Sequence, residues 1–246
     1  MPTRLRFAAR RRLAGGLVAL ALLGACQKGK VGFLNTDVTG ADFGRALALT
    51  DHTGKARTLE DFRGKVVVIF FGFTQCPDVC PTTMSEMAEV MRQLGGRADQ
   101  VQVLFVTIDP ERDTAELLAQ YVPAFDKRFL GLLGDAQATA KVAKEFKVFY
   151  QKVPGSTPGT YSMDHTAGSY VFDPKGRLRL FVKHGQGPAP LVTDLGRLLD
   201  GAWEAGALIR TSGNVAILSP PLVLAEADAQ RIVEAIEAGF ARARAG

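Results

Sequence analysis

Two cysteines, Cys76 and Cys80, lie four residues apart just after a continuously apolar run, residues 66–71. Such a pair can bind a soft metal ion, open and close as a disulfide bond, or do both. A permanent disulfide that staples the loop is the structural alternative, although a bridge across so short a loop removes little unfolded-state entropy. The pair is therefore the first candidate for chemistry in this chain.

Pro81 follows the second cysteine and predicts where a helix begins. Proline has no N–H group and is tolerated in the first turn of a helix, which puts Cys80 at or next to the N-cap. The helix dipole and free N–H groups there would favour a thiolate and lower its pKa. Residues four apart in a helical turn lie about 6 Å apart at Cα, so both sulfurs can form a disulfide or reach one metal ion.

A metal site would need a third donor. Two thiolates make a poor zinc site but suit Cu(I), which is soft and accepts few ligands. Of the three histidines, His52 lies in a turn and His184 precedes a glycine, so both are expected to be solvated. His165 ends a loop rich in Pro, Gly, Ser and Thr, residues 154–160, and loops of that length are usually functional. From the residues alone, His165 is equally well a ligand or an ordinary loop histidine.

Strands and helices alternate around the cysteine pair. The predicted strands are 47–50, 56–58, 66–71, 101–108, 169–173 and 177–182, and the predicted helices are 81–94, 114–122, 136–146 and 190–199. Strand, helix and strand at the cysteine pair predict a parallel βαβ unit. The last two strands, joined by a Pro-Lys-Gly turn, predict an antiparallel hairpin. This order indicates an α/β, thioredoxin-like fold with a central sheet and flanking helices.

The amino terminus has the pattern of an export signal. Five arginines and no acidic residue accompany an apolar run, residues 13–23, that is well short of the ~20 residues of a transmembrane helix. The run ends in Leu-Gly-Ala-Cys26, which resembles a bacterial lipobox. We therefore expect residues 1–25 to be a lipoprotein signal peptide and Cys26 to carry the lipid. An ordinary signal peptide or an uncleaved anchor is the alternative.

Cleavage would change the charge of the chain. The formal net charge of +5 equals the five arginines of residues 1–25, so the mature chain is near neutral and no nucleic-acid partner is expected. We expect residues 26–40 to tether a domain over residues 41–200 to a membrane, on the periplasmic side of a bacterial envelope. In such a compartment a cysteine pair is oxidised unless something reduces or metallates it.

Residues 201–246 are expected to be an extension. They resemble the C-terminal end of class III, pyridoxal-phosphate aminotransferases, yet contain no lysine to form the Schiff base of that chemistry. We interpret them as a non-functional remnant. A docking extension is the alternative.

Three motifs resemble the Sco/SenC family of copper-binding proteins. They are Cys76-Pro-Asp-Val-Cys80-Pro, Val106-Thr-Ile-Asp-Pro-Glu-Arg-Asp-Thr114, and Asp164-His165-Thr166 followed by Tyr170-Val-Phe-Asp-Pro-Lys-Gly176. The resemblance implies a thioredoxin-like domain that binds copper, as Cu(I) or Cu(II), through Cys76, Cys80 and His165. It also implies a role in maturing the binuclear copper site of cytochrome c oxidase subunit II, with that subunit and another periplasmic copper chaperone as partners.

Two acids adjoin these residues. Asp164 beside His165 and Asp78 between the cysteines are candidates to orient the imidazole or shape the surroundings of the sulfurs. Asp78 is equally typical of an acid at a helix start, where it complements the dipole. The segment around Asp109 is expected to define a loop rather than to bind metal.

Two functions of different class remain open. The first is a copper chaperone, and the second is a thiol–disulfide oxidoreductase that uses Cys76 and Cys80 on exported cysteine pairs. The C-x-x-x-C spacing argues somewhat against a general oxidoreductase, which usually has C-x-x-C. A peroxiredoxin-like peroxidase is weaker, because the threonine expected three residues before the attacking cysteine is replaced by Phe73 or Pro77.

Overall fold

The computed structural model describes residues 32–200, 209–212, 215–218 and 234. The expected signal peptide, Cys26 and most of the extension after residue 200 lie outside these residues. Within the described part of the chain, no helix is both long and apolar enough to cross a membrane.

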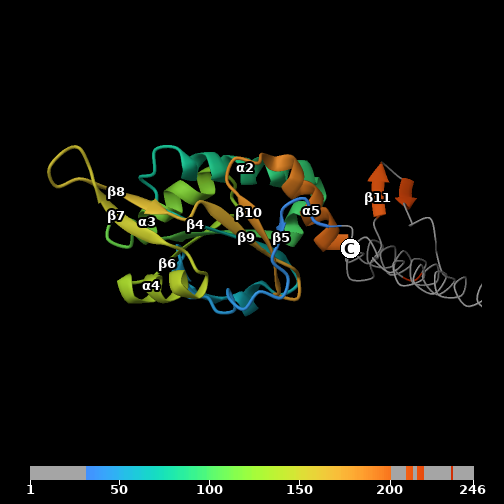
Figure 1. Cartoon of the computed structure of the whole chain (residues 1–246), viewed down its shortest axis with the longest axis horizontal. Helices are drawn as coiled ribbons and strands as arrows, with labels where there is room; N and C mark the ends of the chain where they lie inside the picture. The colour runs from blue at the N-terminus through green and yellow to red at the C-terminus, as the bar shows by residue number, and fades with distance from the viewer. Residues whose placement is uncertain (1–31, 201–208, 213–214, 219–233, 235–246) are drawn as a thin grey trace, which may run out of the picture. The chain divides into compact units, whose positions relative to one another are not determined.

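An eight-stranded mixed sheet forms the centre of residues 32–200 (Figure 1). In spatial order its strands are β1 (Thr36–Asp37), β10 (Leu178–Lys183), β9 (Gly168–Phe172), β4 (Val66–Gly72), β5 (Val101–Thr107), β6 (Leu130–Leu133), β2 (Ala48–Asp51) and β3 (Ala56–Thr58). β4, β5 and β6 run parallel, and the other neighbours pair antiparallel. The predicted parallel unit and the hairpin β9–β10 are both confirmed.

Helices cover both faces of this sheet. α2 (Val79–Leu94) and α5 (Pro188–Asp200) pack against each other on one face, and α4 (Ala136–Glu145) lies on the other (Figure 1). α3 (Ala115–Tyr121) packs against β6, and three short 3-10 helices, η1 (Leu59–Phe62), η2 (Gly95–Gln100) and η3 (Val122–Ala124), complete the connections. This is the α/β, thioredoxin-like architecture that the sequence predicts.

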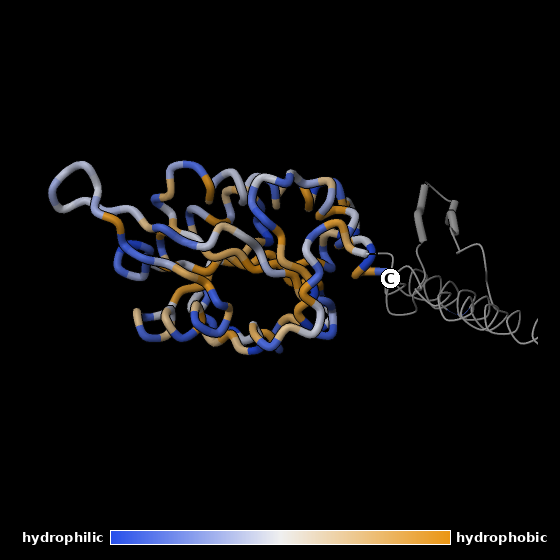
Figure 2. Tube along the Cα trace, viewed as in Figure 1, coloured by the Kyte–Doolittle hydropathy of each residue, from blue (hydrophilic) through white to orange (hydrophobic). Residues whose placement is uncertain are grey.

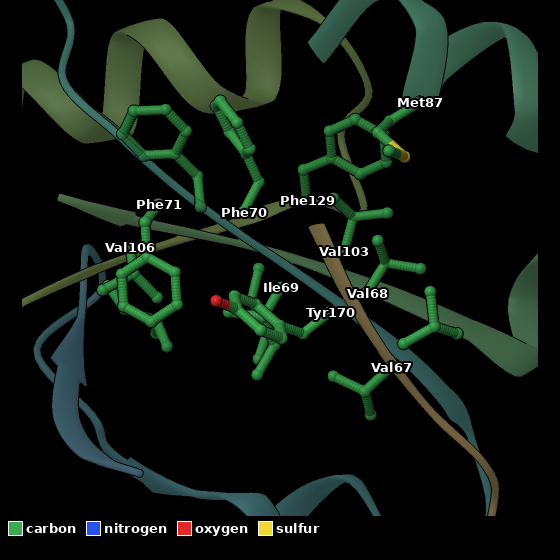
Figure 3. Close-up of a cluster of buried hydrophobic side chains, with 14 of the residues drawn as sticks. Val67, Val68, Ile69, Phe70, Phe71, Met87, Val103, Val106, Phe129 and Tyr170 are labelled. Carbon is green, nitrogen blue, oxygen red and sulfur yellow. The ribbon is translucent and has the colours of Figure 1, made fainter. Parts of the chain in front are cut away.

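The central strand β4 is buried along its whole length. Its side chains alternate between the two faces. Phe71 packs on Phe146, with ring centroids 5.2 Å apart, whereas Figure 3 shows Met87 of α2 on the opposite side of the strand from Val67 and Tyr170. Because both faces are covered, the strand is continuously apolar rather than alternating. Figure 2 shows the hydrophobic residues concentrated along these central strands.

A two-stranded hairpin, β7 (Tyr150–Pro154) and β8 (Tyr161–His165), was not predicted. Its strands pair with each other rather than with the main sheet, and the hairpin projects from the domain (Figure 1). The loop predicted at residues 154–160 is the tip of this hairpin, and His165 ends its second strand. The strands carry few buried residues on either face, so no hydrophobic alternation marks them.

The folded domain begins before residue 41. Strand β1 pairs with β10, and the buried carboxylate of Asp194 in α5 accepts hydrogen bonds from the backbone N–H groups of Leu34 and Asn35 at 2.8–3.0 Å. The expected tether at residues 26–40 is therefore too long, because its second half is fixed to the sheet and to α5.

Part of the C-terminal extension is described by itself. β11 (Ile209–Ser212) and β12 (Val215–Leu218) form an antiparallel hairpin. The aminotransferase-like character and the lack of function of residues 201–246 stay predictions.

Candidate metal centre

Cys76 and Cys80 lie where β4 passes into α2, as the sequence predicts. The helix begins at Val79, two residues earlier than predicted, with Asp78 at its N-cap. Both cysteines are free thiols in this structure, and the backbone N–H of Cys80 donates to the Cys76 sulfur at 3.4 Å. The first N–H groups of a helix have no partner within it. An N–H group of the first helical turn therefore donates to the sulfur of Cys76 rather than to that of Cys80.

The Cys80 side chain is completely buried beneath the helix start. Burial raises the pKa of its thiol well above the usual value, because a buried thiolate loses its hydration. The expectation that the helix dipole lowers this pKa is wrong for Cys80. Its thiol stays protonated until a metal ion replaces the proton on sulfur and the proton leaves to a base or to solvent.

His165 faces Cys80 from the end of β8. Its ring makes edge-to-face contacts with the rings of Phe70 and Phe73, with both centroid distances 6.1 Å. The Nδ1 atom is 3.0 Å from the carbonyl oxygen of Thr166, and a carbonyl can only accept, so Nδ1 carries the proton. The lone pair of Nε2 then faces the Cys80 sulfur at 3.7 Å.

This imidazole is in the form that binds metals. Burial lowers the pKa of His165, which keeps the ring neutral at neutral pH. Neutral imidazole with its other nitrogen hydrogen-bonded to a backbone carbonyl is the usual arrangement of a metal-binding histidine.

Cys80 contacts each of the other two predicted ligands. Its N–H donates to the Cys76 sulfur, and its own sulfur lies against His165. Among the described His, Cys, Asp and Glu side chains, no three already form a closed metal site. A metal ion would have to draw the donors together around Cys80. Two sulfurs and one imidazole nitrogen form a soft donor set, which fits copper better than a hard cation.

Asp113 holds the segment before Cys76 and was missed at the sequence level. Its buried carboxylate accepts hydrogen bonds from the N–H of Thr74 at 3.1 Å and from the hydroxyls of Thr74 and Thr107, both at 2.6 Å. It thereby ties the cysteine loop to the end of β5. Its place after a buried parallel strand, where α/β folds position their sites, was the available signal.

Arg112 fastens the hairpin to the cysteine loop. Its Nη1 donates to the side chain of Gln75 at 3.1 Å and to the carbonyl of Tyr161 at 2.9 Å, and its guanidinium lies 3.6 Å from the centre of the Tyr161 ring. Its Nε pairs with Asp109, which also accepts a hydrogen bond from the Tyr161 hydroxyl at 2.8 Å. Asp109 is thus part of the framework, in line with its expected loop-defining role.

The two acids expected beside the ligands lie outside this arrangement. Asp78 is exposed and accepts a hydrogen bond from the hydroxyl of Thr82 at 3.3 Å, which favours its interpretation as a helix-entry acid. Asp164 is exposed and, by the alternation of β8, points away from the face that carries His165. The hydrogen bond that orients His165 is instead the one that its Nδ1–H donates to the carbonyl of Thr166.

The other two histidines differ from each other. His52 is half-buried and its Nδ1 accepts a hydrogen bond from the N–H of Gly131 at 3.0 Å. It is therefore a structural residue rather than a solvated one. His184 is exposed, as expected, and its Nδ1 lies 3.0 Å from the hydroxyl of Thr83.

Known proteins resemble the chain over this domain. SCO2 homolog of Bos taurus mitochondria is 42% identical over 131 residues, which are 52% of this chain and 49% of that protein. The SCO2-like protein of Rickettsia felis is 34% identical over 171 residues, 69% of this chain and 82% of that protein. The chain thus spans about half the length of its mitochondrial relative.

A solved structure agrees with these relatives. ScoI of Bradyrhizobium japonicum, determined with copper bound, is 43% identical with a TM-score of 0.58, and the match covers 65% of this chain and 100% of that one. The sequence model of SCO1/SenC matches residues 35–200, which contain all three residues of the candidate centre. The chain therefore belongs to the SCO1/SenC family.

Proposed function

We propose that this protein carries copper through Cys76, Cys80 and His165 and assists assembly of the binuclear copper site of cytochrome c oxidase. The observation that carries the proposal is the lone pair of His165 Nε2 directed at the Cys80 sulfur at 3.7 Å, with its tautomer set by Thr166. The copper-bound structure of the 43% identical ScoI supports it.

Copper is the cargo of this site. The ion accepts lone pairs from two sulfurs and one imidazole, and the two thiols release their protons on binding. The histidine is already neutral and releases none. Because a bare thiolate at Cys80 is disfavoured by burial, its ionisation is coupled to the arrival of the metal.

The proposed copper donor, copper acceptor and location rest on the resemblance to the family and on the expected signal peptide of residues 1–25. We propose that copper comes from another periplasmic copper chaperone and passes to cytochrome c oxidase subunit II, outside the cytoplasmic membrane of a bacterium. Cys26 would carry the lipid that holds the protein there. The intact mass of protein extracted from membranes tests this: a mass without a lipid on Cys26 would contradict the anchor.

Copper titration of the reduced mature protein tests the ligands. With Cu(I) in competition with a coloured chelator, the wild type is expected to bind one ion, and Cys76→Ser, Cys80→Ser and His165→Ala to bind it far more weakly. His52→Gln is the matched histidine control, since glutamine can still accept from Gly131. If His165→Ala kept the wild-type affinity and the wild-type Cu(II) spectrum, the three-ligand site would be wrong.

A thiol–disulfide oxidoreductase is the second candidate. It is favoured by the unequal burial of two free thiols, with Cys76 partly exposed to a partner and Cys80 buried behind it. A measured reduction potential, and a mixed disulfide with a subunit II peptide that contains its cysteine pair, would separate the two functions. Full exchange activity in copper-free His165→Ala protein would favour the oxidoreductase.

A further inference from the structure

His184 is fastened to both elements that carry the candidate centre. Its Nδ1 lies 3.0 Å from the hydroxyl of Thr83, which is on α2 one turn beyond Cys80. Its backbone N–H donates to the carbonyl of Ala167 at 3.3 Å, two residues after His165. Residues three apart on a helix are neighbours on its surface. The His184 ring is thus held at the rim of the centre although it is far from it in the sequence.

The hydrogen bond with Thr83 also holds the ring in place. The Thr83 side chain is only 4% exposed, so its hydroxyl is a fixed partner for Nδ1. The ring itself is exposed, and in the tautomer with the proton on Nδ1 the Nε2 atom carries the lone pair that binds a metal ion.

The final ligands are poorly accessible to an incoming ion. Cys80 has no exposed surface, and Cys76 and His165 are each half-buried, so no final ligand is fully open to the solvent. A metal that must lose one set of ligands before gaining another moves more easily if a donor at the rim holds it meanwhile. His184 is the exposed imidazole in that position.

We propose that His184 is a transit ligand, which binds copper at the rim and passes it to Cys76 and Cys80. This rests on the proposed copper-carrying function. Nε2 of His184 first donates its lone pair to the copper ion. A cysteine sulfur then replaces this nitrogen on the ion, and the thiol proton leaves to solvent. The oxidation state of copper does not change. Because His184 is not among the final ligands, it affects the rate of copper exchange and not the affinity at equilibrium.

Stopped-flow loading tests this inference, with reduced full-length protein and Cu(I) supplied as a coloured chelator complex. His184→Gln is expected to load about tenfold more slowly than the wild type, the lower end of what groups around a metal site usually contribute. Its affinity for Cu(I) at equilibrium should stay within about twofold of the wild-type value, because all three final ligands remain. Thr83→Val should slow loading similarly by releasing the ring, and Thr83→Ser should restore it.

Lys183→Gln is the control for a local disturbance, since Lys183 is the exposed last residue of β10 and the neighbour of His184 in the chain. Wild-type loading rates in His184→Gln would overturn the proposal, and so would a large loss of equilibrium affinity, which would make His184 a final ligand. Failure of the wild type to bind Cu(I) at all would instead contradict the proposed function. The two failures are thus distinguishable.

Discussion

Gly72 lies directly against the sulfur of Cys80. A Cβ added at Gly72 would come within 2.9 Å of that sulfur, and it would also meet the rings of Phe70 at 2.9 Å and Phe105 at 3.0 Å. Real Cβ atoms do not approach neighbours so closely. The last residue of β4 therefore leaves the space that the Cys80 sulfur occupies, and it sets how deep the sulfur lies.

Gly72→Ala is expected to weaken both the fold and the candidate centre. The added methyl group must displace two rings or the sulfur, and overpacking of a core usually costs about 1–3 kcal/mol. If the sulfur moves, Cu(I) affinity falls as well. Urea unfolding and chelator competition measure the two effects. Gly96→Ala is the matched control, because a Cβ there meets nothing within 4 Å. Wild-type stability in Gly72→Ala would contradict the close contact.

Asp113→Asn is expected to loosen the loop that precedes Cys76. An amide can accept fewer of the three hydrogen bonds from Thr74 and Thr107 and brings donors that have no acceptor there. A buried group left without its partner costs about 1–3 kcal/mol, measured as a lower free energy of unfolding. Glu111→Gln serves as the control, since the Glu111–Lys152 ion pair is largely exposed. If both changes lowered the free energy of unfolding equally, Asp113 would not be needed to hold the cysteine loop.

Most strands of the sheet and the helices α2 to α5 could be predicted because their residues mark them, whereas the short strands β1 and β6 were not predicted. β4 is an apolar run, β5 is rich in β-branched residues, β9 and β10 flank a Pro-Lys-Gly turn, and α2 has its hydrophobic residues on one face, so each element is marked in the sequence. The hairpin β7–β8 is different. Its strands are held by pairing with each other and by Arg112, and neither leaves a hydrophobic period.

The residues of the candidate centre could be named from the sequence, but their burial and electrostatics could not. Cys76, Cys80 and His165 were named from the motif, and in the structure Cys76 and His165 each contact Cys80. Their role as metal ligands stays a prediction. The burial of Cys80 depends on Gly72 and on rings from β4 and β5, which are contacts distant in the sequence. No local sequence pattern indicates how deeply a cysteine in the first helical turn is buried. The pKa of Cys80 was therefore expected to be lowered, whereas burial raises it. The structural role of His52 depends likewise on Gly131, far along the chain.

Asp51 is expected to make the stability of the domain dependent on pH. Burial alone would raise the pKa of this carboxyl, but hydrogen bonds from Thr53, Arg57 and the N–H of Lys55 lower it from 3.8 to about 2. The folded state thus holds the proton less tightly than the unfolded state. The stabilisation, about 2 kcal/mol, is fully present well above pH 4 and is lost as the pH falls towards 2.

Urea unfolding of the wild type and Asp51→Asn between pH 6 and pH 2.5 measures this effect. The difference in unfolding free energy should be largest at pH 6 and should shrink below pH 4. Asp42→Asn is the control, because Asp42 is exposed and pairs with Arg45 at the surface. A difference that stayed constant down to pH 2.5 would show that Asp51 does not titrate in this window.

Arg112→Lys is expected to leave the fold intact and to disorder the candidate centre. Lysine keeps the charge but lacks the planar fork that reaches Gln75 and Tyr161 together, and it cannot stack in the same way on the Tyr161 ring. The hairpin that carries His165 would then lose its connection to the loop that carries Cys76. Copper affinity should fall about tenfold, as for other groups that orient metal ligands.

Two measurements separate this positioning role from a general loss of stability. The Cu(II) electron paramagnetic resonance spectrum of Arg112→Lys should broaden into more than one species, and backbone N–H groups of β8 should exchange faster while those of β4 stay protected. Arg92→Lys on the exposed face of α2 controls for the change of cation, since its partner Glu89 is also at the surface. A single wild-type spectrum with unchanged exchange in β8 would mean that His165 keeps its place without Arg112, through Thr166 and the rings of Phe70 and Phe73 alone.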